Sequence, residues 1–219
     1  MRTLRLLVAD DHEIVRKGLC ALLGGQPGWQ IAAEARDGRE AVAMAKEFKP
    51  DVAVLDISMP GLNGLEAARQ ISKAVSQTRV LVLTMHESDA FIGEALEAGV
   101  RGFLLKTDVG KDLVGAVDAL GRNQTFFTSE VAQVILDGHL KSGAQNAPAD
   151  GSPRYRLTAR QREIVQLLAE GKSSKEVAVS LNISVKTAET HRANIMRKLE
   201  LHSVSELVRY AVKNQIIEA

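Results

Sequence analysis

Four apolar segments of this chain end on polar side chains that could carry out chemistry together. The segments span residues 6–9, 52–55, 80–83 and 103–105, and the polar residues that follow them are Asp10, Asp11, Asp56, Thr84 and Lys106. The carboxyl ends of parallel strands meet at one edge of a sheet, where α/β proteins place their sites. If these segments are neighbouring strands, the edge gathers three carboxylates, a hydroxyl and an ammonium. Such a set can hold a divalent cation and a phosphoryl group.

The three carboxylates predict a metal site. Clustered carboxylates repel one another unless a cation compensates them, and oxygen-only ligands favour Mg²⁺. We expect Asp11, Asp56 and the backbone carbonyl of Ser58 to bind Mg²⁺ directly. Asp10 would act through a water molecule.

Asp56 is the predicted phosphoacceptor. Its attack on a phosphoryl donor would give an acyl phosphate that water later hydrolyses. Mg²⁺ and Lys106 would neutralise the equatorial oxygens, and the Thr84 hydroxyl would donate a hydrogen bond to one of them. Each residue taken alone also has a structural explanation, such as a turn start for Asp56 or a solvated strand end for Lys106. Their occurrence at four strand ends makes the combination specific.

Alternating strand and helix patterns supply the elements that must position these residues. Strands are expected near 4–9, 30–35, 51–56, 80–84 and 101–105, and helices near 13–24, 39–48, 64–75, 89–98 and 111–121. This order predicts an α/β doubly wound, parallel five-stranded sheet with helices on both faces.

The remainder of the chain predicts a linker and a second domain. A short helix is expected near 128–137, and the Pro/Gly-rich segment 138–153 is typical of a linker. The predicted boundaries are 1–122 for the first domain, 123–153 for the helix and flexible linker, and 154–219 for a small all-α domain. Residues 154–219 hold 12 Lys/Arg against 7 Asp/Glu, whereas residues 1–153 hold 16 against 20. This charge asymmetry favours a nucleic-acid partner for the second domain.

Composition argues against a membrane or secreted protein. Hydrophobic residues make up 45% and charged residues 25% of the 219 residues, as in globular domains, and no apolar stretch reaches membrane-spanning length. No secretory signal is apparent, and the single cysteine, Cys20, excludes a disulfide framework. We therefore expect a cytoplasmic protein with no membrane partner.

The second domain carries a helix-turn-helix pattern. Helices are expected near 159–169, 174–181, 185–199 and 204–214, and a tight turn at 182–184 joins the second to the third. The helix that follows such a turn enters the major groove of DNA. Its inner face is expected to consist of Val185, Ala188, Ile195 and Leu199.

Polar and small residues of this domain form the predicted DNA-facing set. They are Lys172, Lys175, Lys186, Thr187, Glu189, Thr190, Arg192, Ala193, Lys198 and His202. The lysines and His202 are expected to contact phosphates, which supplies affinity without sequence information. Glu189 would accept a hydrogen bond from a cytosine amino group, or orient Arg192 or Lys186. A solvated, mixed-charge helix face is the alternative for this helix considered alone.

Residues 1–122 resemble the receiver domain of two-component response regulators. The matching motifs lie at 8–12, 54–64, 83–84 and 102–106. The resemblance implies a flavodoxin-like fold and phosphoryl transfer to Asp56 from a phosphohistidine on a sensor histidine kinase. It also implies that Phe103 is a switch aromatic, which turns inward as Thr84 moves toward the phosphoryl group. Two departures are Thr107, where many receivers have proline, and Met85, where a smaller residue is common.

Residues 155–217 resemble the LuxR-type helix-turn-helix of the NarL/FixJ class. The matching motifs are 157–163, 169–173, 175–178, 181–184 and 186–199. The resemblance implies a DNA-binding response regulator whose phosphorylation state controls binding to double-stranded promoter DNA and transcription. It further implies a homodimer when the protein is phosphorylated or DNA-bound, with the last helix, near 205–212, as the dimer contact.

Two other classes fit part of the pattern. Aspartyl-phosphate hydrolases also use a strand-end Asp, but they carry a second Asp two residues on, where this chain has Ser58. A DNA-binding protein could instead use its first domain only for phosphate-independent dimerisation. The joint presence of Asp11, Asp56, Thr84 and Lys106 disfavours this alternative. We therefore expect no enzyme activity beyond Mg²⁺-dependent self-phosphorylation and slow autodephosphorylation at Asp56.

Overall fold

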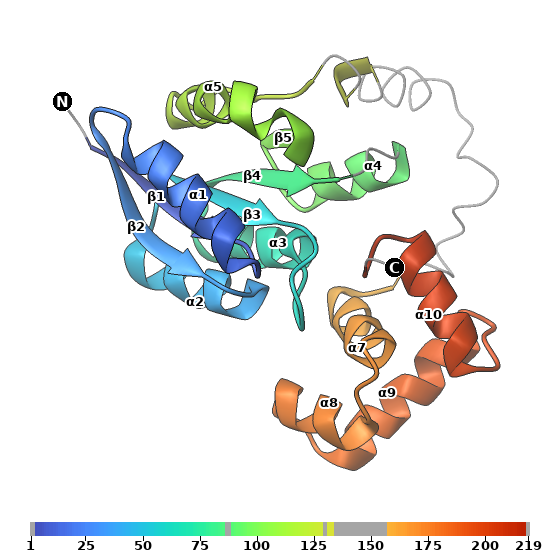
Figure 1. Cartoon of the computed structure of the whole chain (residues 1–219). Helices are drawn as coiled ribbons and strands as arrows, with labels where there is room; N and C mark the ends of the chain where they lie inside the picture. The colour runs from blue at the N-terminus through green and yellow to red at the C-terminus, as the bar shows by residue number, and fades with distance from the viewer. Residues whose placement is uncertain (1–2, 86–88, 129–130, 134–156, 218–219) are drawn as a thin grey trace. The chain divides into compact units, whose positions relative to one another are not determined.

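The computed structural model describes residues 3–85, 89–128, 131–133 and 157–217 (Figure 1). The chain divides into two compact units, Met1–Leu140 and Lys141–Ala219. The first is an α/β unit and the second is helical in its described part. Most of the helix predicted near 128–137, and all of the linker predicted at 138–153, fall outside the described residues.

A five-stranded parallel sheet, in the order β2-β1-β3-β4-β5, forms the centre of the first unit. The strands are β1 Leu4–Ala9, β2 Trp29–Ala35, β3 Val52–Asp56, β4 Arg79–Thr84 and β5 Gly102–Leu105. The inner strands read as continuous apolar runs because both faces of the sheet are covered. The strand order reverses between β1 and β3, which is where doubly wound folds bind ligands.

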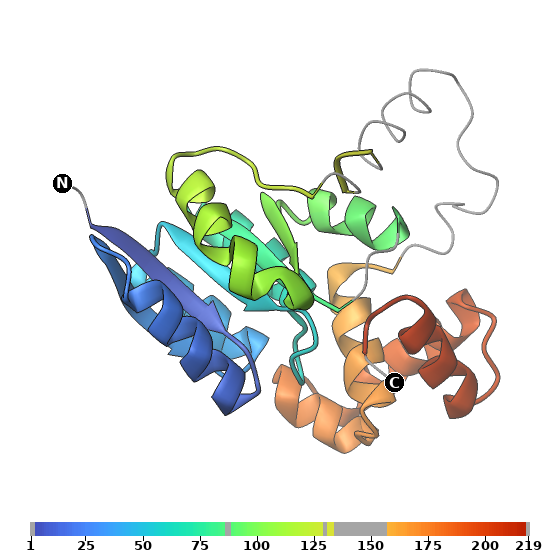
Figure 2. The ribbon, with the colours of Figure 1, turned by 45° about the horizontal axis from the view of Figure 1, so that its top comes forward.

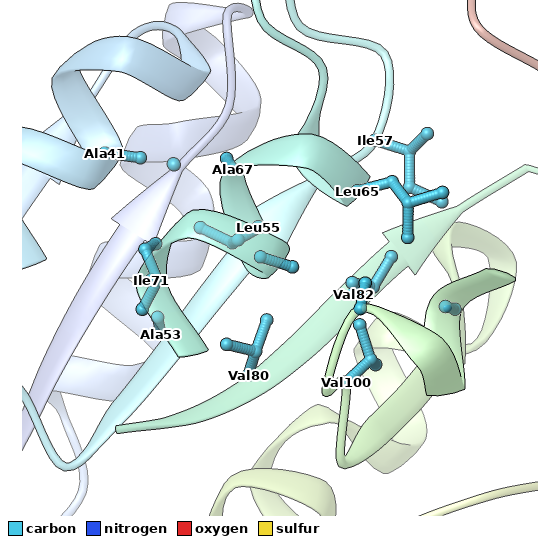
Figure 3. Close-up of a cluster of buried hydrophobic side chains, with 14 of the residues drawn as sticks. Ala41, Ala53, Leu55, Ile57, Leu65, Ala67, Ile71, Val80, Val82 and Val100 are labelled. Atoms are coloured by element: carbon cyan, nitrogen blue, oxygen red, sulfur yellow. The ribbon is translucent and has the colours of Figure 1, made fainter. Parts of the chain in front are cut away.

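Helices cover both faces of this sheet (Figures 1 and 2). They are α1 Glu13–Gly24, α2 Gly38–Phe48, α3 Gly64–Ala74, α4 Asp89–Glu97 and α5 Val109–Gly121. Successive residues along the inner strands enter different clusters. In β1, Leu6 and Val8 pack with α1 and α5, whereas Leu7 and Ala9 pack with the other three helices. Figure 3 shows part of the second cluster, including Leu55, Ile71 and Val82. The predicted doubly wound sheet is confirmed, with every strand and helix end within two residues of its expected place.

A segment after α5 pairs with the outer side of β5. The Phe103 N–H donates to the Phe126 carbonyl at 3.0 Å, and the Phe126 N–H donates to the Arg101 carbonyl at 3.1 Å. Phe127 packs against the core, and Val131 is fully buried in it. The first unit thus continues past residue 122.

The loop after β3 is held by close backbone packing. The Asn63 side chain caps α3 by accepting from the Glu66 N–H at 2.9 Å. The next residue, Gly64, packs directly on the backbone carbonyl of Asp56, so that any Cβ at this position would collide with it. Glycine is therefore required for the approach of α3 to the end of β3.

The part of the second unit that the structure describes contains four helices around one core. They are α7 Ala159–Ala169, α8 Ser174–Leu181, α9 Val185–Lys198 and α10 Val204–Lys213. Thr158 and Ser173 begin α7 and α8 with reciprocal capping boxes. Asn182 adopts the left-handed conformation that ends α8 before the turn into α9.

The predicted inner face of α9 is wrong at one residue. Ala188, Ile195 and Leu199 are buried, but Val185 is 39% exposed. Val185 is the first residue of α9, directly after the Ser184 cap. The side chain of a first-turn residue has no preceding helical turn to pack against, so the helical period does not predict its burial. Within the described residues, no helix is long and apolar enough to cross a membrane.

Candidate functional site

The pairing of the strands brings the polar strand ends of the first unit together. Ala9 pairs with Leu55, which places Asp10 beside Asp56. Asp56 pairs with Leu83, and Thr84 pairs with Leu105, so that Thr84 and Lys106 follow on the same edge. The predicted gathering of residues at the carboxyl edge of the sheet is therefore present in the structure.

Three carboxylates and one imidazole meet at this edge. One ligand atom each from Asp10, Asp11, His12 and Asp56 lie within 4.8 Å of one another. The Asp10 and Asp56 side chains are 0% and 1% exposed, whereas that of Asp11 is 28% exposed. Two carboxylates are thus fully desolvated, and Asp11 borders solvent.

Lys106 supplies positive charge to the buried carboxylates. Its ammonium lies 2.9 Å from Asp56 Oδ1 and 3.6 Å from Asp10 Oδ2, with the side chain 21% exposed. The chain continues from Lys106 through a 3-10 turn, Lys106–Asp108, into α5, without a cis peptide bond in the described residues. Thr107 thus lies in an ordinary turn that leads from β5 into α5.

Burial raises the pKa of the Asp56 carboxyl above its ordinary value. The hydrogen bond and charge of Lys106 act in the opposite direction, the charge of Asp10 adds to the rise, and the backbone of Ser58 lowers the pKa. Asp56 is therefore a carboxylate that would be stabilised by additional positive charge.

Thr84 and Phe103 occupy the neighbouring strands. Thr84 ends β4 and is 7% exposed, and Phe103 on β5 is 1% exposed within the core that α2, α3 and α4 cover. Met85, which follows Thr84, is 51% exposed. The Phe103 ring thus lies inside the protein, and Met85 points outward.

The carboxylate cluster fits a divalent cation. Among the described residues, Asp10 Oδ2 and Asp11 Oδ1 are buried without a hydrogen-bond donor in good geometry, and the buried Asp56 carboxylate is met by Lys106 and the backbone of Ser58. Buried polar atoms cost free energy unless they are paired or coordinate a metal. Lys106 compensates only part of this charge, so that the donor set matches a hard cation such as Mg²⁺.

Arg16 and His12 support the site and were missed from the sequence. The buried Arg16 Nη1 donates to the Asp10 carbonyl at 2.8 Å, and its Nε lies 3.5 Å from Glu34 Oε2. The His12 N–H donates to Asp10 Oδ1 at 2.8 Å. One signal was available for Arg16: it shares the spacing of the buried Leu19 and Leu23 on α1, which places it on the inner face.

Part of the predicted DNA-facing set shares one groove of the second unit. Glu189, Arg192, Ala193 and His202 line it together with Ser174, Met196, Leu201, Ser203 and Val204. The groove runs between α9, the start of α8 and the α9–α10 loop. Its lining therefore combines charged side chains with the apolar side chains of Met196, Leu201 and Val204.

The other predicted residues lie outside this groove. Lys175, Lys186, Thr187 and Thr190 are exposed, and Lys172 is half-buried. Lys198 is also half-buried, and its ammonium lies 3.4 Å from Gln161 Oε1. Lys198 is thus engaged within the unit.

Both units of the chain match known protein families. Residues 6–118 match the response regulator receiver domain, and residues 155–211 match the luxR family of bacterial regulatory proteins. The transcriptional regulatory protein LiaR of Bacillus subtilis (strain 168) is 37% identical over 214 residues, covering 98% of this chain and 99% of LiaR. This chain belongs to the NarL/FixJ class of response regulators. The oxygen regulatory protein NreC of Staphylococcus carnosus (strain TM300) is 34% identical over 216 residues, covering 98% of this chain and all of NreC.

Solved structures resemble this response regulator as well. A LuxR-family response regulator from Aurantimonas sp. SI85-9A1 covers 63% of this chain and 99% of its own, at 36% identity and a TM-score of 0.58. RcsB from Salmonella enterica serovar Typhimurium, bound to promoter rprA with the phosphomimetic BeF3-, covers 95% of this chain and 98% of its own, at 25% identity and a TM-score of 0.62. The chain is thus a two-component transcription regulator with a receiver domain and a LuxR-type DNA-binding domain.

Proposed function

We propose that Asp56 accepts a phosphoryl group from a phosphohistidine of a sensor histidine kinase, and that its phosphorylation state controls promoter binding and transcription. The observation that carries the proposal is the Asp56 carboxylate itself. It is buried, lies 2.9 Å from the Lys106 ammonium and stands beside the second buried carboxylate, that of Asp10. A buried carboxylate in this state is suited to gain a cation and a phosphoryl group together.

Each residue at the edge then has a role in the transfer. Asp10, Asp11, Asp56 and the Ser58 carbonyl would hold Mg²⁺, whose charge offsets that of the phosphoryl oxygens when it is bound. The Asp56 oxygen attacks phosphorus as the bond to the donor nitrogen breaks, and Lys106 neutralises an equatorial oxygen. Thr84 donates a hydrogen bond to another oxygen. Water later hydrolyses the acyl phosphate, so that the signal ends without a further enzyme activity.

A protein phosphodonor has a surface to bind beside the site. Ile14 and Val15 lie in the first turn of α1, three and four residues after Asp11, and are 89% and 40% exposed. Apolar side chains this exposed at the rim of a charged site favour burial by a partner. We assign this surface to the sensor kinase, and the reaction to the cytoplasm, where the promoter is also accessible.

The second unit is proposed to carry the output. Helix α9 would enter the major groove of double-stranded promoter DNA, with Glu189, Thr190, Arg192 and Ala193 toward the bases. Lys172, Lys175, Lys186, Lys198, Thr187 and His202 would contact the backbone. Phosphorylation would favour a homodimer on DNA, in which Phe103 and Thr84 relay the state of Asp56.

The test is phosphoryl incorporation into Asp56→Asn. Incubation with a labelled small-molecule phosphodonor and Mg²⁺ should label the parent protein and leave Asp56→Asn unlabelled, because the amide is not a nucleophile. Asp118→Asn is a matched control, since it removes an exposed carboxylate from α5. Labelling of Asp56→Asn at the parent rate would reject Asp56 as acceptor.

A further inference from the structure

His12 lies beside the carboxylates in an unusual way. Its Nδ1 is 3.0 Å from Asp11 Oδ1 and 3.6 Å from Asp10 Oδ1, and its side chain is 67% exposed. His12 occupies the cap position of α1, but its side chain makes no capping hydrogen bond. The imidazole therefore turns toward the carboxylates instead of toward the helix.

The contact between His12 and Asp11 is close without being a hydrogen bond. Asp11 Oδ1 is a buried atom that accepts no well-oriented hydrogen bond from any residue the structure describes. In an octahedral site with metal–ligand bonds of about 2.1 Å, adjacent ligand atoms lie about 3.0 Å apart. The separation of Nδ1 from Oδ1 is that of two donor atoms converging on one ion.

A fully buried oxygen of the cluster lacks a hydrogen-bond donor as well. Asp10 Oδ2 faces the same cluster and has no well-oriented donor among the described residues, and the Lys106 ammonium lies 3.6 Å from it. Asp10 is 0% exposed, so water does not replace that donor. The site thus has oxygen donors from buried carboxylates and a nitrogen donor at its solvent-facing rim.

We propose that His12 supplies an imidazole nitrogen to the cation held by Asp10, Asp11 and Asp56, so that the site prefers first-row transition-metal dications to Mg²⁺. Imidazole suits the first-row ions from iron to zinc, a range that includes cobalt, whereas Mg²⁺ prefers oxygen ligands. The inference rests on the cation site of the proposed function. It adds the nitrogen ligand and the resulting choice of metal ion.

The test compares Co²⁺ and Mg²⁺ binding by the full chain and by His12→Ala. Co²⁺ is followed by its visible absorption, and both ions are measured by calorimetry. We expect His12→Ala to lose about tenfold or more in Co²⁺ affinity and to change the cobalt spectrum. Its Mg²⁺ affinity should change less than about twofold, because Mg²⁺ uses the oxygens.

Two further variants separate a ligand role from other roles. His191→Ala removes a half-buried histidine of α9 and should leave the cobalt spectrum unchanged. His12→Gln keeps a polar side chain at the same place, and thermal unfolding checks that both His12 variants are folded. Equal losses of Co²⁺ and Mg²⁺ affinity would mean that His12 only orients Asp11, and this result would overturn the proposal.

The outcome is distinguishable from a failure of the proposed function. Unchanged Co²⁺ binding in His12→Ala would also refute the nitrogen ligand, while Mg²⁺-dependent labelling of Asp56 in the same variant would leave phosphoacceptance intact. Loss of Co²⁺ and Mg²⁺ binding in Asp56→Asn, with normal folding, confirms that both ions use this cluster. Binding of Co²⁺ to Asp56→Asn at parent affinity would place the ion elsewhere and refute the inference.

Discussion

The two units position their functional residues by opposite means. The acidic site of the receiver is assembled from the ends of separate strands, and its central carboxylates are fully buried. The proposed DNA-facing surface comes mainly from one helix and its flanks, and most of its predicted residues are exposed. The backbone therefore fixes the first site before any partner arrives, whereas we propose that DNA binding completes the geometry of the second. Substitutions should accordingly act on the chemistry or stability of the first unit and on the affinity of the second.

The largest effect is expected at Lys106. Lys106→Ala removes the ammonium 2.9 Å from Asp56 and should slow phosphoryl transfer by about 100-fold or more, since fixed charge at a reacting centre typically carries such factors. Initial rates of labelling from a small-molecule phosphodonor provide the measurement. Lys111→Ala removes an exposed charge from α5 and should react at the parent rate. Equal rates for the two variants would exclude Lys106 from the reaction.

The next effect is one on protein stability, and it is expected at Gly64. Gly64→Ala places a methyl group against the Asp56 backbone carbonyl and should lower the free energy of unfolding of the first unit by about 1–3 kcal/mol. Gly115→Ala is the control, because its Cβ meets open space within α5 and should be neutral or slightly stabilising. Denaturant unfolding measures both. Two variants of equal stability would contradict the packing described at the end of β3.

A smaller effect is expected on the DNA side. Arg192→Ala should weaken binding to the operator by about tenfold, through the loss of one base or phosphate contact. Arg122→Ala removes the same charge from an exposed position of the first unit and serves as control. Anisotropy titrations at several salt concentrations measure affinity and the number of phosphates contacted. An unchanged operator affinity for Arg192→Ala would move the DNA interface away from this part of α9.

The smallest effect is expected on the free energy of unfolding at Asp56, whose buried charge destabilises the metal-free protein at neutral pH. Its folded-state pKa is raised, so that its favourable contribution is complete below the unfolded-state pKa and is lost as pH rises through the folded-state pKa. Asp56→Asn should therefore stabilise the metal-free protein at neutral pH, by about 1 kcal/mol or a few degrees in Tm. The gain should shrink as pH falls toward the unfolded-state pKa. Calorimetry across this range tests it, and a gain that grows on acidification would reverse the assigned sign.

Most of the receiver fold and of its acidic site could be predicted from the sequence, because each strand and its polar end leave a local signal in the chain. Each strand is an apolar run with a polar residue at its end, and parallel pairing alone aligns those ends. The roles of Arg16 and His12 depend on where a helix face and a cap residue meet a neighbouring loop, which the pattern does not specify. On α9 the helical period predicted the burial of Ala188 and Ile195 but not the exposure of Val185, because end residues lack a full set of neighbours.

The pairing of Phe126 with the outer side of β5 has a practical consequence for anyone who separates the two units. A fragment ending at residue 122 would remove the backbone groups that satisfy Phe103 and Arg101, and would uncover a strand edge that invites pairing with another molecule. It would also leave a hole where Val131 fills the core. A fragment cut near residue 140 keeps both, so it should remain monomeric in dilute solution where the shorter one aggregates.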